Sequence, residues 1–393
     1  MRFFGQYKKI TFLFLAFFSI SVFNSCIGNE RKDRLKFPAI VAIDQAKQRV
    51  FVIDNQKNGL NVIDVAKNNE VLTKKNKDGD KEGLLTEEDA LILPEFPSNA
   101  ALASLENDLS RLFVLGANEG PLQKIIVIDF DIAGGLRRSE ISPISVAGES
   151  SDVLVGIQVD EKRGHVWVTN SGSASLYAYD IKTGEQIENS HIQLSGIPTR
   201  LSIDPGLDLM AVANSSSTEI SIIDLNNLNQ APQTLDIGRK TRDLALVSNN
   251  QGSLLFCSIL DENRAEAYRL NLNDLSQSFL IGEVNPSTPA DAFDEDTVIL
   301  NGNINLVTAG NLTDGRVGAY YTQSSGDLLA LRVAQDLTSI EVQRVEVGAV
   351  SGEGIEPLLD NSGNISDIYF ASPGVGTLTV VDPFEAEFSD QIP

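Results

Sequence analysis

The sequence predicts an all-β fold: a seven-bladed β-propeller with about four antiparallel strands in each blade. Three observations support this prediction. A pair of apolar strands recurs seven times, the units repeat at roughly 40–50 residues, and the strands are apolar at consecutive positions. No long stretch after the N-terminal segment has a helical period, so a repeat of alternating helices and strands is disfavoured.

The repeat is clearest in three copies, which span residues 44–64, 160–180 and 204–224. Each copy begins and ends with Asp, 20 residues apart. Between the two acids lie an apolar strand, a turn rich in Gly, Ser or Thr, and a second apolar strand. Such regular spacing indicates a repeated hairpin.

Four looser copies complete the set of seven hairpins. They pair residues 112–115 with 125–129, 254–259 with 267–270, 317–322 with 328–333, and 368–371 with 378–382. A further strand is expected at the end of most units, where an apolar residue lies one or two positions before Gly148, Gly196, Gly238, Gly282 or Gly348.

The composition of the strands fits blades that are covered on both faces. Residues 51–53 and 125–128 are apolar throughout, whereas a half-exposed strand alternates apolar and polar residues. Blade one is expected to start near Phe37. The last strand of blade seven is expected near residues 384–388, or else residues 30–36 complete that blade and remove an exposed strand edge.

Two of the strands resemble a known repeat family. Trp167-Val168-Thr169-Asn170 and Ala211-Val212-Ala213-Asn214 resemble the Tyr-Val-Thr-Asn repeat of YVTN-type seven-bladed β-propellers. The following strand ending in Ile-Asp and the Val-Gly at the blade end also fit that family. The resemblance covers roughly residues 37–390 and implies the fold more than a function, because propellers support many unrelated activities.

The N-terminal segment has the layout of an export signal. Arg2, Lys8 and Lys9 precede an uncharged apolar run, residues 10–23, and Ser25-Cys26 follows. The run has 14 residues, fewer than the ~20 that span a bilayer. This pattern resembles a bacterial lipoprotein signal in which Cys26 becomes the lipid-modified N-terminus; the alternative is a cleaved signal or membrane stub with an incidental cysteine.

These observations predict three parts of the chain. Residues 1–25 are the signal peptide, 26–36 a tether, and 37–393 the propeller, with insertions near 74–98 and 284–302. The expected location is the bacterial outer membrane or cell surface, with the membrane as a partner through the lipid anchor.

The overall charge limits the classes of partner. The formal net charge is −23, and it becomes −26 when the signal segment with its three basic residues is removed. Such an acidic surface repels phosphate backbones, so nucleic acid is not expected as a partner, and the charge favours solubility of the propeller. A monomer is expected. Cys257 lies in an apolar run and is expected to be a buried thiol.

The first insertion contains a candidate calcium loop. Asp78, Asp80, Glu82, the carbonyl of Leu84 and Asp89 fall at the ligand spacing of an EF-hand-type loop, with Gly83 at the sharp turn. The loop departs from the pattern in having Glu at the fifth position and Asp at the twelfth. A solvated acidic loop without metal is the alternative, and no other cofactor is expected.

Few residues suggest catalysis. His165 and His191 are the only histidines, and both open strands, so a structural role is expected for them. The chain has neither a Cys-x-x-Cys-His nor a Gly-x-Ser-x-Gly motif. Turn-capping roles are expected for the acids and amides at strand ends: Asp64, Asp180, Asp224, Asp382, Asn55, Asn170 and Asn214.

Two functions fit these observations. The first is a non-catalytic binding platform on the cell envelope, whose loops contact a protein or glycan. The alternative is an enzyme resembling the propeller lactonases, with carboxylates or a bound cation at the central channel. Three or more converging acids or Asn in the channel would favour the enzyme, and an apolar or plugged channel would favour the platform.

Overall fold

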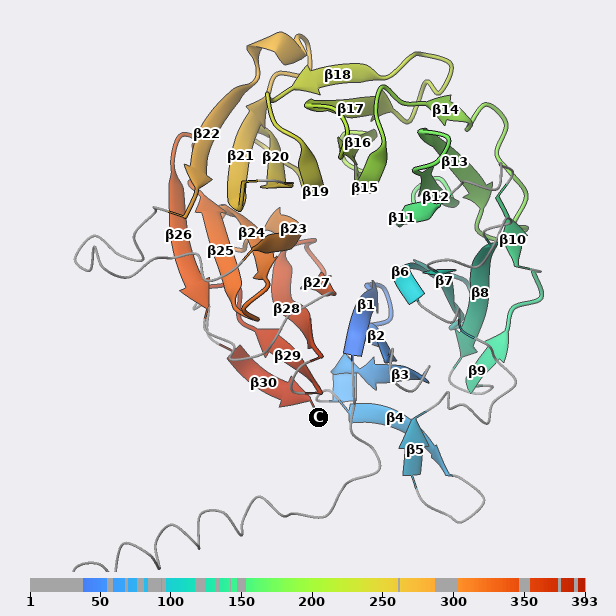
Figure 1. Cartoon of the computed structure of the whole chain (residues 1–393). Helices are drawn as coiled ribbons and strands as arrows, with labels where there is room; N and C mark the ends of the chain where they lie inside the picture. Colours follow the sequence, from blue (N-terminus) through green and yellow to red (C-terminus); the bar gives the residue numbers. More distant parts are fainter. Residues whose placement is uncertain are drawn as a thin grey trace, which may run out of the picture. The chain divides into compact units, whose positions relative to one another are not determined.

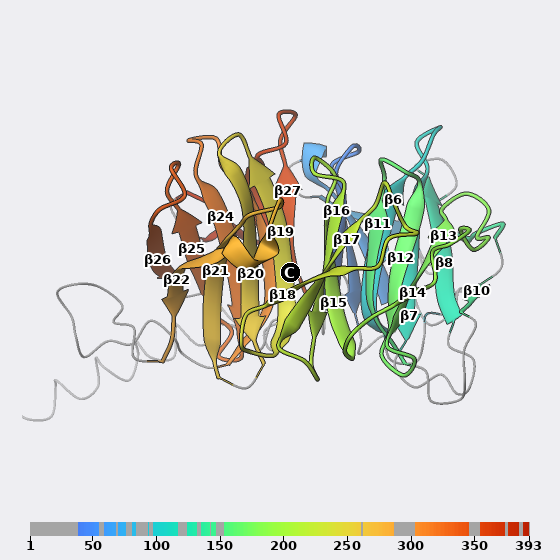
Figure 2. The ribbon, with the colours of Figure 1, turned by 90° about the horizontal axis from the view of Figure 1, so that it is seen from above.

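Seven antiparallel sheets surround a central axis and form a seven-bladed β-propeller, as the sequence predicts (Figure 1). The computed structural model describes residues 38–54, 59–67, 70–75, 81–83, 93, 97–116, 124–131, 135–141, 143–146, 153–260, 262–286, 303–345, 354–373, 376–384 and 388–392. Within this part of the chain no helix is long and apolar enough to cross a membrane. Viewed at right angles to Figure 1, the blades stand side by side around the axis (Figure 2).

Each blade runs outward from the axis in chain order. The innermost strands are β1 (Pro38–Asp44), β6 (Pro97–Ser104), β11 (Leu154–Asp160), β15 (Pro198–Asp204), β19 (Thr241–Asn249), β23 (Ile304–Asn311) and β27 (Ile355–Leu359). The second strands are β2 (Arg49–Asp54), β7 (Ser110–Gly116), β12 (His165–Asn170), β16 (Leu209–Asn214), β20 (Gly252–Ile259), β24 (Val317–Gln323) and β28 (Ile365–Ser372). The third strands are β3 (Gly59–Asp64), β8 (Lys124–Asp131), β13 (Ser175–Asp180), β17 (Glu219–Asp224), β21 (Arg264–Leu270), β25 (Leu328–Val333) and β29 (Thr377–Val381).

The outer strands vary more than the inner ones. They are β4 (Glu70–Lys75), β14 (Ile192–Gln193), β18 (Gln233–Asp236), β22 (Phe279–Val284), β26 (Ile340–Val345) and β30 (Phe388–Ile392). In blade two, β9 (Gly135–Arg138) and β10 (Ile144–Ser145) both pair with β8. The first insertion adds β5 (Lys81–Gly83), which pairs with β4, and two short 3₁₀ turns are η1 (Val65–Lys67) and η2 (Leu275–Gln277).

Alternate residues of one strand pack against two different neighbouring blades. In β2, Val50 and Val52 join the apolar cluster shared with blade seven, whereas Phe51 and Ile53 join the cluster shared with blade two. In β12, Trp167 faces blade four while its neighbours on the strand face blade two. A strand with two buried faces must be apolar throughout, which explains the continuous apolar runs in the sequence.

The core is therefore divided into layers rather than gathered in one mass. Among the described residues, each of the seven contacts between adjacent blades has its own apolar cluster. Burying one large apolar side chain stabilises the fold by roughly 1.5–3 kcal/mol, so every layer contributes substantially to holding its two blades together.

Acids at strand ends cap the turns, as expected. The Asp180 carboxylate accepts hydrogen bonds from the amides of Lys182 and Thr183, both at 2.8 Å. The side chains of Asp224 and Asp382 each accept a hydrogen bond from the backbone amide two residues further on, at 2.9 and 2.7 Å. These contacts confirm the capping role for three of the predicted residues.

Among the described residues the ring closes between blades one and seven without a shared strand; residues 30–36, the alternative closing segment, lie outside the described residues. Blade seven takes all four strands from the C-terminal part of the chain, and its last strand, β30, begins where the expected 384–388 strand ends. The Gln45 amide nitrogen donates to the Pro357 carbonyl at 2.8 Å, and its oxygen accepts from the Leu359 amide at 2.9 Å. A Cβ added at Gly354 would lie 2.8 Å from the Ala39 carbonyl oxygen, so the two backbones meet where only glycine fits.

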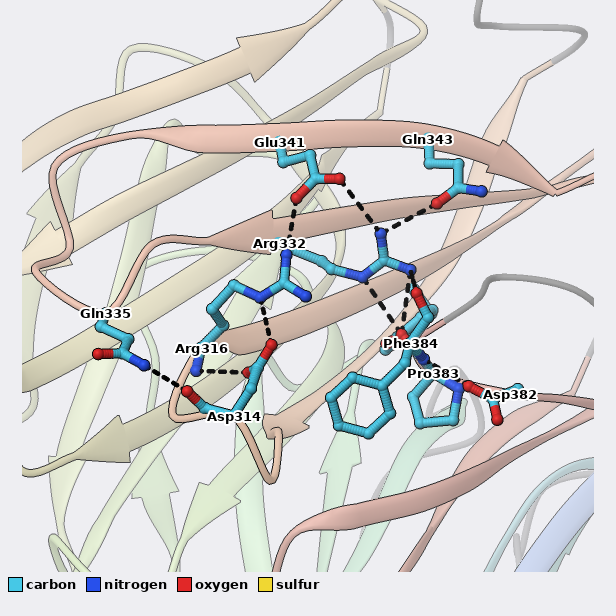
Figure 3. A network of polar contacts seen from close by, with 10 residues as sticks. Asp314, Arg316, Arg332, Gln335, Glu341, Gln343, Asp382, Pro383 and Phe384 are labelled. Atoms are coloured by element: carbon cyan, nitrogen blue, oxygen red, sulfur yellow. Dashed lines mark hydrogen bonds and ion pairs between the residues drawn. The ribbon is translucent and has the colours of Figure 1, made fainter.

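Arg332 connects blade six to blade seven through hydrogen bonds (Figure 3). Its side chain is 2% exposed and donates to the Pro383 carbonyl at 3.0 and 3.2 Å and to the Phe384 carbonyl at 3.0 Å. The Tyr320 hydroxyl donates to the same Pro383 carbonyl at 2.7 Å. A guanidinium carries five donors in a planar fork, which suits it to bind several carbonyls of one turn.

We predict that Arg332→Met lowers the free energy of unfolding by about 2–4 kcal/mol, because buried carbonyls lose their charged donor. Urea unfolding followed by fluorescence measures this change. Arg316→Met is the matched control: Arg316 binds Asp314 and Glu341 in the same network but is 29% exposed, so the expected loss is below about 1 kcal/mol. An equal loss of unfolding free energy in the two variants would contradict the conclusion that Arg332 holds blades six and seven together.

Candidate binding site in the central channel

The seven innermost strands border a channel of about 660 Å³. Its lining includes backbone and side chains from every blade. Three charged side chains in this lining come from positions near the start of their strands: Arg200 on β15, Asp243 on β19 and Glu356 on β27.

Local irregularities of the strands place two of these side chains. The pairing of β15 with β16 shifts between Pro198 and Leu201, and the pairing of β19 with β20 shifts between Thr241 and Asp243. A β-bulge re-aims the side chain that it carries. Arg200 and Asp243 lie at these shifts, on adjacent blades.

Asp243 is nearly buried and tied to the backbone of two blades. It is 7% exposed, and its two oxygens accept hydrogen bonds from the Leu244 and Val307 amides, each at 2.9 Å. Burial raises the pKa of this carboxyl above its usual value, while Arg200 and the two amides act in the opposite direction.

Glu356 lies partly open to the channel lumen but is enclosed by protein. Burial, followed by the charge of Asp243, raises the pKa of Glu356 to about 8, and Arg200 opposes the shift. Among the described residues, neither Glu356 nor Arg200 has a side-chain hydrogen bond or an ion pair within 4 Å. The channel therefore holds a carboxyl that is largely protonated at pH 7 and a guanidinium that has no direct partner in the described part of the chain.

Other polar side chains of the channel wall bridge one blade to the next. The Gln158 oxygen accepts from the Ile203 amide at 3.0 Å, and the Ser202 hydroxyl accepts from the Leu246 amide at 2.9 Å. The Asn311 amide nitrogen donates to the Ser248 carbonyl at 3.0 Å. These side chains hold the wall together, which sets Arg200 and Glu356 apart from them.

A second charged cluster, on blade five, is internally paired. Glu266 is 1% exposed, accepts from the Tyr268 hydroxyl at 2.6 Å and lies 3.0 Å from the Arg239 Nε. Arg264 pairs with Glu283 at 2.5 Å. With each charge matched by a neighbour, this cluster has a structural role and the channel remains the better candidate site.

Most of the site residues predicted from the sequence lie outside the described residues. This applies to Cys26, Asp78, Asp80, Leu84 and Asp89. The backbone of Glu82 belongs to β5, where it pairs with Lys74, but its side chain is not among those described. Lipidation and calcium binding therefore stay predictions.

The histidines and Cys257 occupy the positions expected. His165 opens β12 with its ring 6.5 Å from that of Trp167, and burial lowers its pKa. The His191 ring stacks on Tyr177 at 4.8 Å. Cys257 is a buried free thiol whose pKa burial raises well above its usual value. A high pKa leaves little of the reactive thiolate, which gives Cys257 a packing role.

The channel matches neither of the two states expected from the sequence. It is a cavity with both polar and apolar residues in its lining, so it is neither purely apolar nor plugged. The described residues also contain no group of three or more His, Cys, Asp or Glu placed to hold a metal ion. Arg200, Asp243 and Glu356 were missed because folding alone brings these distant positions together; the only local signal is a charged residue near the start of an otherwise apolar inner strand.

Comparison with known proteins shows the fold. No family model matches the chain, and no curated protein sequence matches it. Kuenenia stuttgartiensis hydrazine synthase is 15% identical over 91% of this chain and 98% of its own, with a TM-score of 0.59. A protein from Lactobacillus plantarum is 14% identical over 91% of this chain and 96% of its own, with a TM-score of 0.58. At such low identity these similarities extend to the fold alone.

We predict that Glu356→Gln changes how stability depends on pH. The folded protein keeps the Glu356 proton up to about pH 8, whereas the unfolded chain releases it near the ordinary value of 4.5. Between these values the folded state binds more protons, so raising the pH destabilises the wild type relative to the variant. Water in the channel weakens the effect, and we expect a relative gain of about 1–2 kcal/mol for the variant between pH 5 and 8.5.

Thermal or urea unfolding at both pH values measures this difference. Glu161→Gln is the matched control, because Glu161 also lines the channel but is exposed. If wild type and Glu356→Gln respond identically to pH, Glu356 does not hold its proton in the folded state.

Proposed function

We propose that the chain is a cell-envelope lipoprotein, anchored through Cys26, whose propeller acts as a non-catalytic binding platform. The signal layout and the YVTN-like repeats support the location and the type of scaffold. The observation that carries the binding role is how the polar side chains of the channel are used. Several of them form hydrogen bonds from one blade to the next, whereas Arg200 and Glu356 form none with the described residues and keep polar atoms available for a ligand.

A rigid wall suits recognition. The wall side chains that are fixed by hydrogen bonds across blades lose little freedom when a ligand binds, so the cost of ordering side chains is confined to groups such as Arg200 and Glu356. The acidic surface favours partners that are neutral or cationic, and a protein or glycan of the envelope fits this requirement.

A lactonase-like enzyme is the second candidate, and one observation favours it. Glu356 has a pKa near neutrality in an enclosed channel beside Arg200, a property of general acids and bases. The purified protein and Glu356→Gln are incubated with lactones of several ring sizes. The platform predicts no hydrolysis above that of the variant, whereas a rate that falls about 100-fold or more in the variant supports the enzyme.

Membrane attachment is tested separately. We predict that the wild type sediments with the membrane fraction and that mass spectrometry finds an acylated peptide starting at Cys26. Cys26→Ala should release or mislocalise the protein, because more than one acyl chain is needed for stable anchoring. A soluble mature form starting at another residue would contradict the lipoprotein assignment.

We retain calcium as a proposal for the loop of residues 78–89. Calorimetric titration with calcium, repeated on Asp80→Ala, tests it. Uptake that the variant abolishes supports a site, and no uptake by the wild type at millimolar calcium assigns the segment to a solvated loop.

A further inference from the structure

We propose that Arg200, Asp243 and Glu356 form a channel site for a small zwitterion, a molecule that carries both a carboxylate and an ammonium group. The inference goes beyond the proposed binding role, because the ligand that it names is a small molecule and not a protein or glycan of the envelope. The three side chains come from blades four, five and seven, and all line the same channel. A ligand there would contact several blades at once.

In this channel site, Arg200 binds the anionic group of the ligand and forms the anion-binding half of the site. A guanidinium can hold a carboxylate through two parallel hydrogen bonds. Among the described residues no carboxylate lies within ion-pair distance of it, although its charge influences both Asp243 and Glu356. We therefore infer that the partner of its donors is a carboxylate of the ligand.

Asp243 and Glu356 supply the cation-binding half. Each oxygen of Asp243 accepts one backbone hydrogen bond, and a carboxylate oxygen has room for a second. The acceptor positions of Glu356 are unused by the described residues. The charge of Asp243 disfavours ionisation of Glu356, so the two carboxyls repel each other when both are charged. An ammonium group between them removes this repulsion.

The mixture of charges selects against simpler ligands. A plain carboxylate bound to Arg200 would be repelled by Asp243, and a plain amine would be repelled by Arg200. A zwitterion can place each of its charges beside an opposite one, so both halves contribute to its affinity.

Binding should also release a proton. Glu356 holds its proton at pH 7, and an ammonium group beside it lowers its pKa, so the carboxylic acid becomes a carboxylate and the proton passes to the buffer. A ligand that lacks the ammonium group would cause no such release. Proton release therefore reports on the cation-binding half alone.

The test is isothermal titration of the full-length, detergent-purified protein at pH 7 in two buffers of different ionisation enthalpy. The probes are glycine, 4-aminobutyrate and 6-aminohexanoate, with hexanoate and hexylamine as analogues that carry one charge. We expect at least one amino acid to bind about tenfold or more tightly than either analogue, which is a difference of about 1.4 kcal/mol in binding free energy. Its binding should also release a proton.

Variants assign the two halves. Arg200→Met keeps an apolar stem and should weaken binding about tenfold or more; Glu356→Gln should weaken it similarly and abolish proton release. Glu161→Gln is the matched control, because it makes the same substitution near the far end of an inner strand and should leave binding unchanged.

Three results would overturn the proposal: no binding of any amino acid at about 10 mM, equal binding of hexanoate, or an equal loss in Glu161→Gln, which would indicate a general charge effect. These outcomes are distinct from failure of the proposed function, which is decided by membrane fractionation and lactone hydrolysis.

Discussion

Hydrogen bonds between a side chain of one blade and the backbone of the next are the interaction on which the channel wall depends. Each innermost strand has a strand partner on one side only, so its other edge faces the channel or the neighbouring blade. Unpaired backbone groups at such an edge are costly when buried. The side chains of Gln158, Ser202 and Asp243 each accept a hydrogen bond from a backbone amide of the following blade. The polar residues of the wall are therefore part of the scaffold.

The same interaction closes the ring. Many ring-shaped folds need a strand from one terminus to complete the blade of the other, but here blade seven is complete by itself. Gln45 makes both a donor and an acceptor contact with blade seven, and Gly354 allows the two backbones to approach. Val50 and Val52 also pack against apolar side chains of blade seven, and this hydrophobic contact stabilises the closed ring together with the hydrogen bonds.

The sequence was sufficient for the scaffold because the blades are built from local repeats. The Asp-to-Asp spacing and the continuous apolar runs predicted the hairpins that the structure contains, since hairpins pair neighbours along the chain. The extra strand β5 and the divided outer strand of blade two were not predicted. Both are in segments that depart from the repeat, where no second copy shows which residues pair.

The candidate site could not be predicted in the same way. Arg200, Asp243 and Glu356 are far apart in the chain, and only the circular arrangement of the blades brings them to one channel. Their chemistry also depends on surroundings that the sequence does not show: burial and the charge of Asp243 give Glu356 a pKa of about 8. Sequence reasoning could recognise a charged residue in an apolar inner strand, but not which charges face one another.

Native-state hydrogen exchange tests the account most directly. The amides of Ile203, Leu246, Val307 and Leu359 donate to side chains of adjacent blades. If these contacts hold the ring together, all four amides exchange only through global unfolding, with the same free energy as the central strands. Exchange at the rate of exposed loop amides, while the second strands stay protected, would contradict the central role of the side-chain bridges.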